Sequence, residues 1–171
     1  DKPWLVPTIE TIRIPGPGRL KGWWPKLRVF DAKNGLAGRV LYLDLDTLIV
    51  NDLEPILDYP APFALVPHAG TFNGKDGKRV VKRYNSSVMV WNAGEQGYLW
   101  DEWTPKIASI LWGDQDWIGD QALAATMPAE WFPRLSQVNG PPFGAARVIL
   151  AKKPKNEEAA KSRAWFREMW A

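Results

Sequence analysis

The sequence predicts an α/β domain in which a mixed sheet is flanked by helices. Short apolar runs of strand character alternate along the chain with segments of helical periodicity, which is the order expected of a layered α/β domain. One run, Arg39–Val50, is aliphatic on both faces before its polar residues begin, as in a strand that is covered on both sides. At 171 residues the chain fits one domain, 1–171, with enough length to bury a substantial core.

The first part of the chain is expected to lead into a central strand. Residues 1–22 are rich in proline and glycine and predict an irregular lead-in that resembles the end of an element, so we expect further sequence upstream. Trp23–Phe30 predicts a short helix, in which Pro25 is tolerated because it would lie in the first turn. Asp31–Gly38 predicts a turn region, and Val40–Leu45 the central strand.

Three elements are expected between this strand and residue 91. Asn51 or Asp52 is a suitable cap for a short helix or turn over Asn51–Leu57. Two prolines precede the apolar run Phe63–Val66, which predicts a short strand, and Ala69–Lys78 predicts a mobile loop. Tyr84–Trp91 predicts a second buried strand.

The remaining chain is expected to be mainly helical. Gln96–Leu111 has a helical pattern that Pro105 should split, because an interior proline removes a hydrogen bond. The other predicted segments are an acidic loop, a helix, an irregular stretch, a last strand and a helix capped by Asn156 within 156–171: Gly113–Asp116, Trp117–Met127, Trp131–Val138, Arg147–Leu150 and Asn156–Trp170.

The composition excludes several classes of protein. The chain is 46% hydrophobic, which argues against disorder, and its net charge of +3 does not demand nucleic acid as a partner. It has no cysteine, so disulfides and thiolate metal sites are excluded. No apolar run approaches the roughly 20 residues of a transmembrane segment. We expect a cytoplasmic protein whose late basic residues would be the part to meet an anionic membrane surface. Its 11 tryptophans would serve as anchors in the core or in a homo-oligomer interface.

Two carboxylates one residue apart, Asp44 and Asp46, follow the central strand. Burial of an unpaired charge is costly, so they are expected at the carboxyl end of that strand, where open α/β sheets bind ligands. Two carboxylates there suit a hard divalent cation and the phosphates that it carries. The simpler alternative is an acidic turn.

Further polar residues lie at the ends of other predicted elements, and one cleft could combine them. They are Asn85, Ser86 and Ser87; Asp114, Gln115 and Asp116; and Lys152, Lys153 and Lys155. Amides and carboxylates bind hydroxyl groups in fixed orientations, while lysines contribute point charges to phosphates. Such a cleft would bind a cation, a polyol and a diphosphate together.

The segments WWPKL, RVLYLDLDTLIV, YNSSVMVWN, GDQDW and KKPK, in this order, resemble the retaining nucleotide-sugar glycosyltransferases of the glycogenin and lipooligosaccharide galactosyltransferase type, nearest a bacterial branch. The resemblance runs from about Lys21 to Lys155. It implies the GT-A fold, incomplete at the N-terminus, and a nucleotide-diphosphate sugar as donor, with UDP as the nucleotide. It implies Mn²⁺ or Mg²⁺ as cofactor and leaves a glycan, lipid or protein open as acceptor.

The resemblance also implies roles for individual residues. Asp44 and Asp46 would hold the cation and the donor diphosphate. Asn85, with Ser86 beside it, would contact the transferred sugar, and Asp114 would hold sugar hydroxyls while Gln115 lies near the anomeric carbon. Lys153 would contact the diphosphate, and Lys26 is a further candidate for the donor pocket.

Two features depart from this family. Its members supply a late histidine as a metal ligand, whereas the single histidine of this chain, His68, lies far from Lys153 in sequence. The strand–helix–strand unit that binds the nucleotide base in the family has no counterpart before Thr11.

Two alternatives therefore stay open. Asp44 and Asp46 also resemble the first motif of haloacid-dehalogenase-type phosphatases, in which Lys106 and the pair Asp116 and Asp120 would be the later motifs. The other alternative is a non-catalytic, pseudo-enzyme module that binds carbohydrate.

Overall fold

The computed structural model describes residues 20–73, 79–151 and 163–170. A four-stranded sheet has the order β1-β4-β3-β5, and a smaller sheet pairs β2 with β6. Within the larger sheet β4 is antiparallel to both β1 and β3, whereas β5 runs parallel to β3. The predicted α/β class with a mixed sheet is thus confirmed. The strands are β1 (Arg39–Leu43), β2 (Thr47–Ile49), β3 (Phe63–Asn73), β4 (Arg79–Asn92), β5 (Ala125–Thr126) and β6 (Val148–Leu150).

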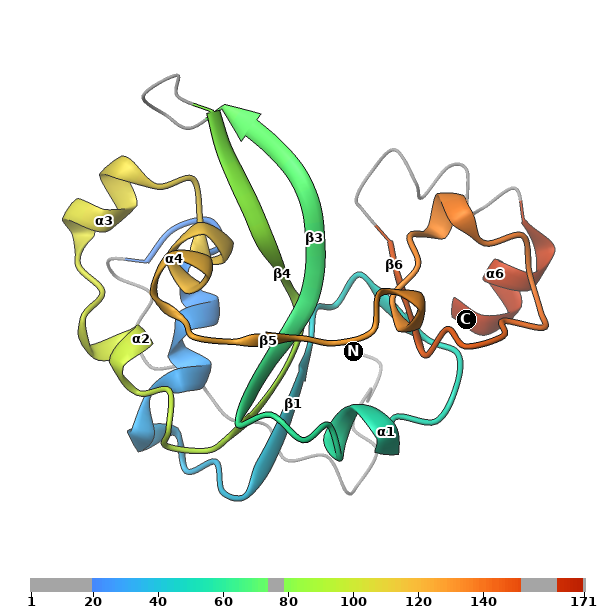
Figure 1. Ribbon diagram of the computed structural model, residues 1–171, viewed down its shortest axis with the longest axis horizontal. Coiled ribbons are helices and arrows are strands. Elements are labelled where there is room, and N and C mark those ends of the chain that lie inside the picture. Colours follow the sequence, from blue (N-terminus) through green and yellow to red (C-terminus); the bar gives the residue numbers. More distant parts are fainter. Residues whose placement is uncertain (1–19, 74–78, 152–162, 171) are drawn as a thin grey trace, which may run out of the picture.

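The helices are short and flank the larger sheet. Figure 1 shows α2, α3 and α4 on one side of this sheet, and β6 and α6 on the other. Within the described ranges, no helix is both long and apolar enough to cross a membrane. The α-helices are α1 (Glu54–Leu57), α2 (Tyr98–Asp101), α3 (Pro105–Ile110), α4 (Asp114–Gln121) and α6 (Ala164–Trp170). The 3-10 helices are η1 (Trp24–Phe30), η2 (Ala32–Asn34), η3 (Ala129–Trp131) and η4 (Leu135–Gln137).

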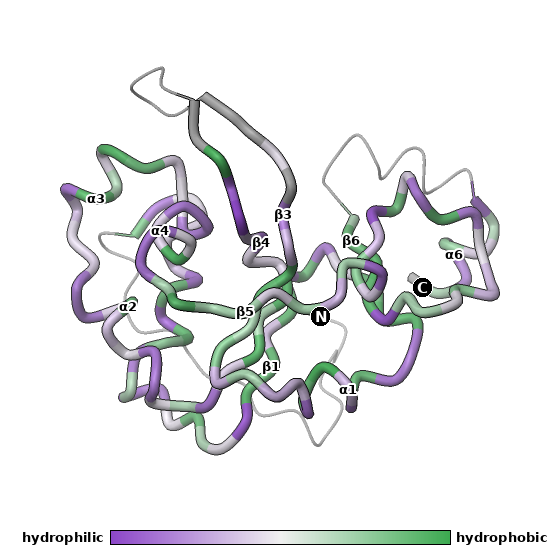
Figure 2. Tube along the Cα trace, viewed as in Figure 1, coloured by the Kyte–Doolittle hydropathy of each residue, from purple (hydrophilic) through white to green (hydrophobic). Residues whose placement is uncertain are grey.

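The sheet is buried on both faces. Successive strand residues point to opposite sides, so each strand contributes side chains to both. On β4, Met89 and Trp91 pack against η1, α2 and α4, whereas Val88 and Val90 belong to the cluster on the other face. Figure 2 shows the corresponding hydrophobic stretches along the lower part of the sheet. On β1 the alternation places Tyr42 on the face of η1 and α4. The same alternation directs the side chain of Asp44, two residues after Tyr42, toward these helices.

An irregularity in β4 changes the register beside the end of β1. Leu65 of β3 pairs with Met89, but the next residue, Val66, pairs with Asn85. Residues 86–88 of β4 therefore bulge out of register with β3, and a bulge of this kind re-aims the side chains that it contains. This bulge brings the Ser86 side chain to the first turn of α4.

Arg39 fixes the beginning of β1. Its guanidinium donates to the carbonyl oxygens of Leu57, Tyr59, Ala61 and Pro62 and to the Asn92 side chain, at 2.7–3.3 Å. A planar group with five N–H donors satisfies this whole loop at once.

The loop predicted for Ala69–Lys78 is wrong over its described part. β3 continues to Asn73 and β4 begins at Arg79, and together they form the long hairpin that projects from the sheet in Figure 1. Register shifts near Pro67 and Gly70 accommodate residues that ordinarily interrupt strands. Residues 74–78 lie outside the described chain.

The acidic loop predicted for Gly113–Asp116 is also wrong, because Asp114 is the first residue of α4. Carboxylates are favourable in a first helical turn, so this composition was compatible with a helix start. The helix predicted to reach Met127 ends at Gln121, and residues 125–126 pair with β3 instead. The expected division of the preceding helix at Pro105 is confirmed, because α2 and α3 are separate and Pro105 begins α3.

Both ends of the chain were only partly open to comparison. Most of the predicted lead-in lies outside the described residues, as does the Asn156 cap. The described C-terminal helix begins at Ala164.

Candidate functional site: a lysine among carboxylates

Asp44 begins the tight turn that joins β1 to β2. The Asp44 N–H donates to the carbonyl of Ser87 at 2.8 Å, which continues the pairing of β1 with β4. The Asp44 carbonyl accepts from the Thr47 N–H at 3.2 Å and from the Thr47 hydroxyl at 2.7 Å. Leu45 at the tip of the turn is 95% exposed. The carboxylates thus follow the strand as the sequence predicts, on a backbone that is fixed by its own hydrogen bonds.

The ammonium group of Lys26 lies at the centre of the site. Its Nζ is 2.8 Å from Asp44 Oδ1, 3.0 Å from Asp44 Oδ2 and 3.2 Å from Asp114 Oδ2. It also donates to the Ser86 hydroxyl at 3.2 Å and to the Ser86 carbonyl at 3.3 Å. The Ser86 hydroxyl in turn donates to Asp114 Oδ2 at 2.8 Å. We call Lys26, Asp44, Ser86 and Asp114 the lysine–carboxylate cluster.

Each member of the cluster comes from a different element. Asp44 follows Tyr42 by two residues on the helical side of β1, Ser86 lies on the β4 bulge, Asp114 begins α4, and Lys26 belongs to η1. The Lys26 side chain is 11% exposed and that of Asp114 is 6% exposed, so both charges are largely withdrawn from water. Buried charges are tolerated when they are paired and hydrogen-bonded, as they are in this cluster.

Sequence reasoning missed Tyr42 as a member of this region. Its hydroxyl donates to Asp44 Oδ1 at 2.9 Å, and the Lys26 ammonium lies 5.4 Å from the centre of its ring. Burial raises the pKa of Tyr42 far above its ordinary value, and the negative charges of Asp44, Asp114 and Asp46 add to this shift. The phenol therefore stays protonated and keeps its hydrogen bond. Its spacing of two residues before Asp44 was the available signal.

Replacing Tyr42 by phenylalanine is expected to lower the free energy of unfolding by about 1.5–3 kcal/mol, because the partly buried carboxylate of Asp44 loses a donor. Chemical denaturation at neutral pH measures this loss. Tyr98→Phe is the matched control, since the Tyr98 hydroxyl forms no hydrogen bond with another described residue. Since the folded pKa of Tyr42 is raised, its contribution is present at neutral pH and is lost only in strongly alkaline solution. Equal effects of the two variants would contradict a specific role for the Tyr42 hydroxyl.

Asp46 lies beside the cluster and is half-buried. Its charge contributes to the pKa shift of Tyr42, and its carbonyl accepts from the Ala151 N–H at 2.9 Å. No ion pair or side-chain hydrogen bond joins its carboxylate to another described residue. Two carboxylates contact the Lys26 ammonium and the charge of Asp46 is nearby, so the region carries a net negative charge.

These residues fit a divalent cation only with help from a substrate. Magnesium is commonly held by one or two carboxylates together with substrate phosphates, and the oxygens of Asp44 and Asp46 are of the right kind. Within the described part of the chain, no three histidine, cysteine, aspartate or glutamate side chains converge to hold a metal. His68, half-buried on β3, is therefore not part of such a group. Substrate oxygens would have to complete the shell.

The remaining predicted site residues are Gln115, Asn85 and Lys153. Gln115 is half-buried and directly follows Asp114. The Asn85 Oδ1 accepts from the Ser87 N–H at 2.7 Å, so Asn85 shapes the bulge that presents Ser86. Lys153 lies outside the described residues, and the described chain stops at Ala151 beside Asp46.

Alternate residues of β4 fasten α4 to the sheet. Lys82 Nζ lies 2.5 Å from Asp116 Oδ1, the Tyr84 hydroxyl donates to the Ala124 carbonyl at 2.8 Å, and Ser86 donates to Asp114. Asp116 thus faces away from the lysine–carboxylate cluster, although it lies in the same predicted motif as Asp114. Burial and the nearby Asp116 charge raise the pKa of Asp120, and Lys82 opposes this shift.

Replacing Asp120 by asparagine is expected to stabilise the fold at pH 7 by no more than about 0.5 kcal/mol, which raises the melting temperature slightly. A carboxyl whose folded pKa is raised stabilises the fold at acid pH, and this contribution is lost as the pH rises through the folded pKa. The asparagine amide does not ionise, so the variant does not lose this stability as the pH rises. Thermal melts at several pH values test this, with the difference between variant and wild type disappearing below the ordinary value of 3.8. A gain that persists there would contradict the assignment.

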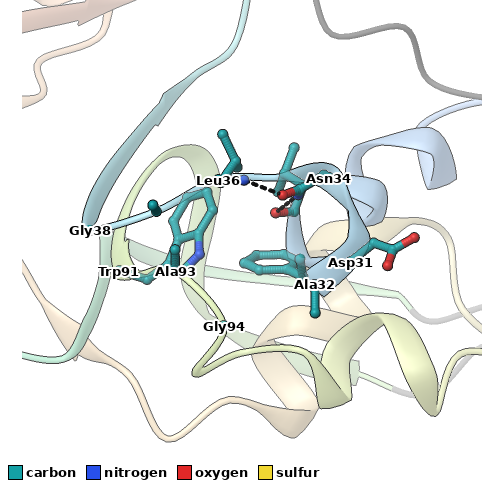
Figure 3. A pocket seen from close by; sticks show the side chains of 11 residues that line it. Asp31, Ala32, Asn34, Leu36, Gly38, Trp91, Ala93 and Gly94 are labelled. Carbon is teal, nitrogen blue, oxygen red and sulfur yellow. Dashed lines mark hydrogen bonds between the residues drawn. The ribbon is translucent and has the colours of Figure 1, made fainter.

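A separate hollow of about 330 Å³ lies at the opposite end of β1. Figure 3 shows its lining, in which Asn34 Oδ1 accepts from the Leu36 N–H at 2.9 Å and Trp91 forms one wall. Gly38 of this lining and Asp44 are six residues apart along an extended strand, or about 20 Å. The hollow is therefore not part of the lysine–carboxylate cluster.

No protein-family model matches the chain. The sequence is similar to that of a plant glycosyltransferase. A protein of Arabidopsis thaliana, provisionally named UDP-glucuronate:xylan alpha-glucuronosyltransferase 3, is 26% identical over 165 residues, which cover 86% of this chain and 24% of that protein. Among solved structures, the glycosyltransferase GlyE of Streptococcus pneumoniae TIGR4 aligns with a TM-score of 0.47 and 17% identity, over 63% of this chain and 28% of that one. The chain thus spans about a quarter of the length of each.

Proposed function

We propose that this domain carries the donor site of a glycosyltransferase, which moves a sugar from a nucleotide diphosphate to an acceptor hydroxyl with retained configuration. The observation that carries the proposal is the convergence of Lys26, Asp44, Ser86 and Asp114 from four separate elements beside Asp46. Similarity over 86% of the chain to a protein named for the transfer of glucuronate from UDP supports the same class of chemistry.

The residues of the cluster suit the two parts of such a donor. The carboxylate of Asp114 and the amide of Gln115 would bind sugar hydroxyls and hold the anomeric carbon toward the acceptor, because these groups fix hydroxyl orientation. Lys26 keeps Asp114 in place and presents a positive charge near the diphosphate. Ser86 and Asn85 would line the sugar side, and Lys153 would add a charge on the diphosphate side.

Asp44 and Asp46 would hold Mn²⁺ or Mg²⁺ together with the donor phosphates. The cation, when bound, offsets the negative charge that develops on the departing diphosphate. Other residues of the chain keep the two aspartates in position. Tyr42 and Lys26 hold the Asp44 carboxylate, and the Asp44–Thr47 turn fixes the backbone of both aspartates. UDP is the nucleotide that the sequence resemblance favours.

A thermal-shift titration with UDP and Mn²⁺ tests this function. The melting temperature is expected to rise by roughly 5–10 °C at a ligand concentration of about 100 Kd, and only when both ligands are present. Asp46→Asn is expected to abolish the shift while the melting temperature without ligand is unchanged, because the Asp46 carboxylate pairs with no other described residue. The exposed Asp58→Asn is the matched control and should keep the full shift.

The outcome also separates the rival functions. A cooperative melt that UDP and Mn²⁺ leave unchanged would contradict the donor site and favour a non-catalytic carbohydrate-binding module. Release of inorganic phosphate from a phosphate ester would favour a phosphatase. The structure gives that alternative less support, because Lys106 is exposed on α3 and Asp116 pairs with Lys82, so neither is among the described contacts of Asp44.

A further inference from the structure

Among the described residues, two exposed tryptophans lie close in sequence to members of the lysine–carboxylate cluster. Trp23 is 68% exposed and Trp112 is 52% exposed, whereas Trp24, Trp91 and Trp117 are each 7% exposed or less. An indole ring left in water costs free energy that burial would recover, so an exposed pair next to a candidate site calls for a ligand with an apolar face.

Trp23 lies next to the cluster through η1. It directly precedes this helix, and its carbonyl accepts from the Lys26 N–H at 3.2 Å. In a 3-10 helix, side chains three residues apart lie one above the other. The Trp23 indole and the Lys26 side chain therefore leave the same side of the helix, and the Lys26 ammonium ends on Asp44 and Asp114.

A second contact reaches the same place from α4. A Cβ atom placed on Gly113 would lie 3.4 Å from the Cε3 atom of Trp23, so the indole rests on the Gly113 backbone. That distance is an ordinary van der Waals contact, so the Trp23 indole lies against the position of Gly113. Gly113 stands between Trp112 and Asp114. Lys26 and Gly113 thus independently place Trp23 near Asp114, which directly follows Gly113.

The segment that carries Trp112 is held by polar contacts. The Trp112 N–H donates to Asp116 Oδ2 at 3.2 Å, and Asp116 pairs with Lys82 of β4. On the other side, Trp24 anchors η1 through its packing against Trp103, with ring centres 5.7 Å apart. The two exposed indoles are therefore presented by anchored backbone rather than by a free loop.

A sugar ring combines an apolar C–H face with a rim of hydroxyls. An indole ring covers the face, while polar groups beside the ring bind the rim. We propose that Trp23, with Trp112 beside it, forms a stacking surface that receives a carbohydrate acceptor next to Asp114. This inference rests on the proposed function and selects a glycan over a lipid or a protein as acceptor, because isolated indoles beside polar groups do not form the broad apolar patch that those partners need.

Calorimetric titration of the chain with xylohexaose and with cellohexaose tests the surface. Binding of at least one of these neutral oligosaccharides is expected. Trp23→Ala should weaken it about tenfold, which corresponds to about 1.4 kcal/mol, and Trp112→Ala should weaken it less. Leu123→Ala, at a side chain that is 99% exposed and lies beyond the end of α4, is the control and should bind as the wild type does.

The thermal shift with UDP and Mn²⁺ is measured on the same variants. An unchanged shift in Trp23→Ala shows that the variant folds and keeps its donor site, so that its weaker oligosaccharide binding supports the stacking surface. Tryptophan-dependent oligosaccharide binding without any UDP shift would remove the transferase and retain the surface. No binding of either oligosaccharide, or binding that Trp23→Ala leaves unchanged, overturns the proposal, as does binding to phosphatidylcholine vesicles in place of oligosaccharide.

Discussion

Replacing Lys26 by methionine is expected to lower the free energy of unfolding by about 3–5 kcal/mol, the cost of leaving a buried charge without its partner. Lys26 is the described cation that contacts Asp44 and Asp114, whose side chains are 22% and 6% exposed. Methionine keeps the length and apolar stem of the side chain but removes the ammonium, so the two carboxylates repel each other at low dielectric. Urea denaturation at pH 7 measures the loss.

The exposed Lys106→Met is the matched control and should change the stability by no more than about 0.5 kcal/mol. In the double variant Lys26→Met, Asp114→Asn, one of the two repelling charges is gone, so part of the lost stability should return. If Lys26→Met were as stable as the control, the lysine–carboxylate cluster would not be a stabilising feature of the fold.

Replacing Asp114 by asparagine is expected to reduce sugar transfer by about 10²–10³-fold while UDP binding changes by no more than about twofold. Asparagine has nearly the same shape and can still accept from Ser86 and Lys26, so the fold should lose only about 1 kcal/mol, the difference between a charged and a neutral hydrogen bond. The donor sugar would lose the carboxylate that orients its hydroxyls. Hydrolysis of a UDP-sugar and UDP-dependent thermal shifts measure the two effects separately.

Asp116→Asn is the matched control for this experiment. Asp116 lies in the same helical turn but pairs with Lys82 on the far part of β4, so its replacement should leave turnover unaffected. An equal loss of turnover in both variants, or an equal loss of turnover and UDP binding in Asp114→Asn, would contradict the assigned role of Asp114.

Local patterns were sufficient for the elements that tertiary contacts did not alter. The run Val40–Leu45 was recognised as a strand because it is aliphatic on both faces, and Pro105 was recognised as a break because it cannot donate a backbone hydrogen bond. The prediction for Ala69–Lys78 failed because glycine and lysine indicate a loop locally, whereas the pairing of β3 with β4 supplies hydrogen bonds that sequence neighbours cannot supply. The helix predicted to end at Met127 was extended too far for a similar reason, since residues 125–126 pair with β3.

The candidate site was predictable as a set of residue types but not as a set of contacts. The sequence placed Asp44 and Asp46 at the end of a strand, and the period of two along that strand would have indicated Tyr42 as a neighbour of Asp44. The pairing of Lys26 with Asp44 and Asp114 was out of reach, because it joins residues 18 to 88 positions apart in the chain.

The sequence by itself determined that this chain forms a mixed α/β domain with two carboxylates after an aliphatic strand, because strand burial and charge solvation are local properties of residue type. The predicted central position of that strand is wrong, because β1 lies at the edge of the four-stranded sheet. Only the tertiary structure decided which charges meet. The β4 bulge brings Ser86 to Asp114, η1 carries Lys26 between two carboxylates, and Trp23 packs against Gly113 beside them. These contacts depend on the packing of η1, β4 and α4 against one another, and no local pattern encodes that packing.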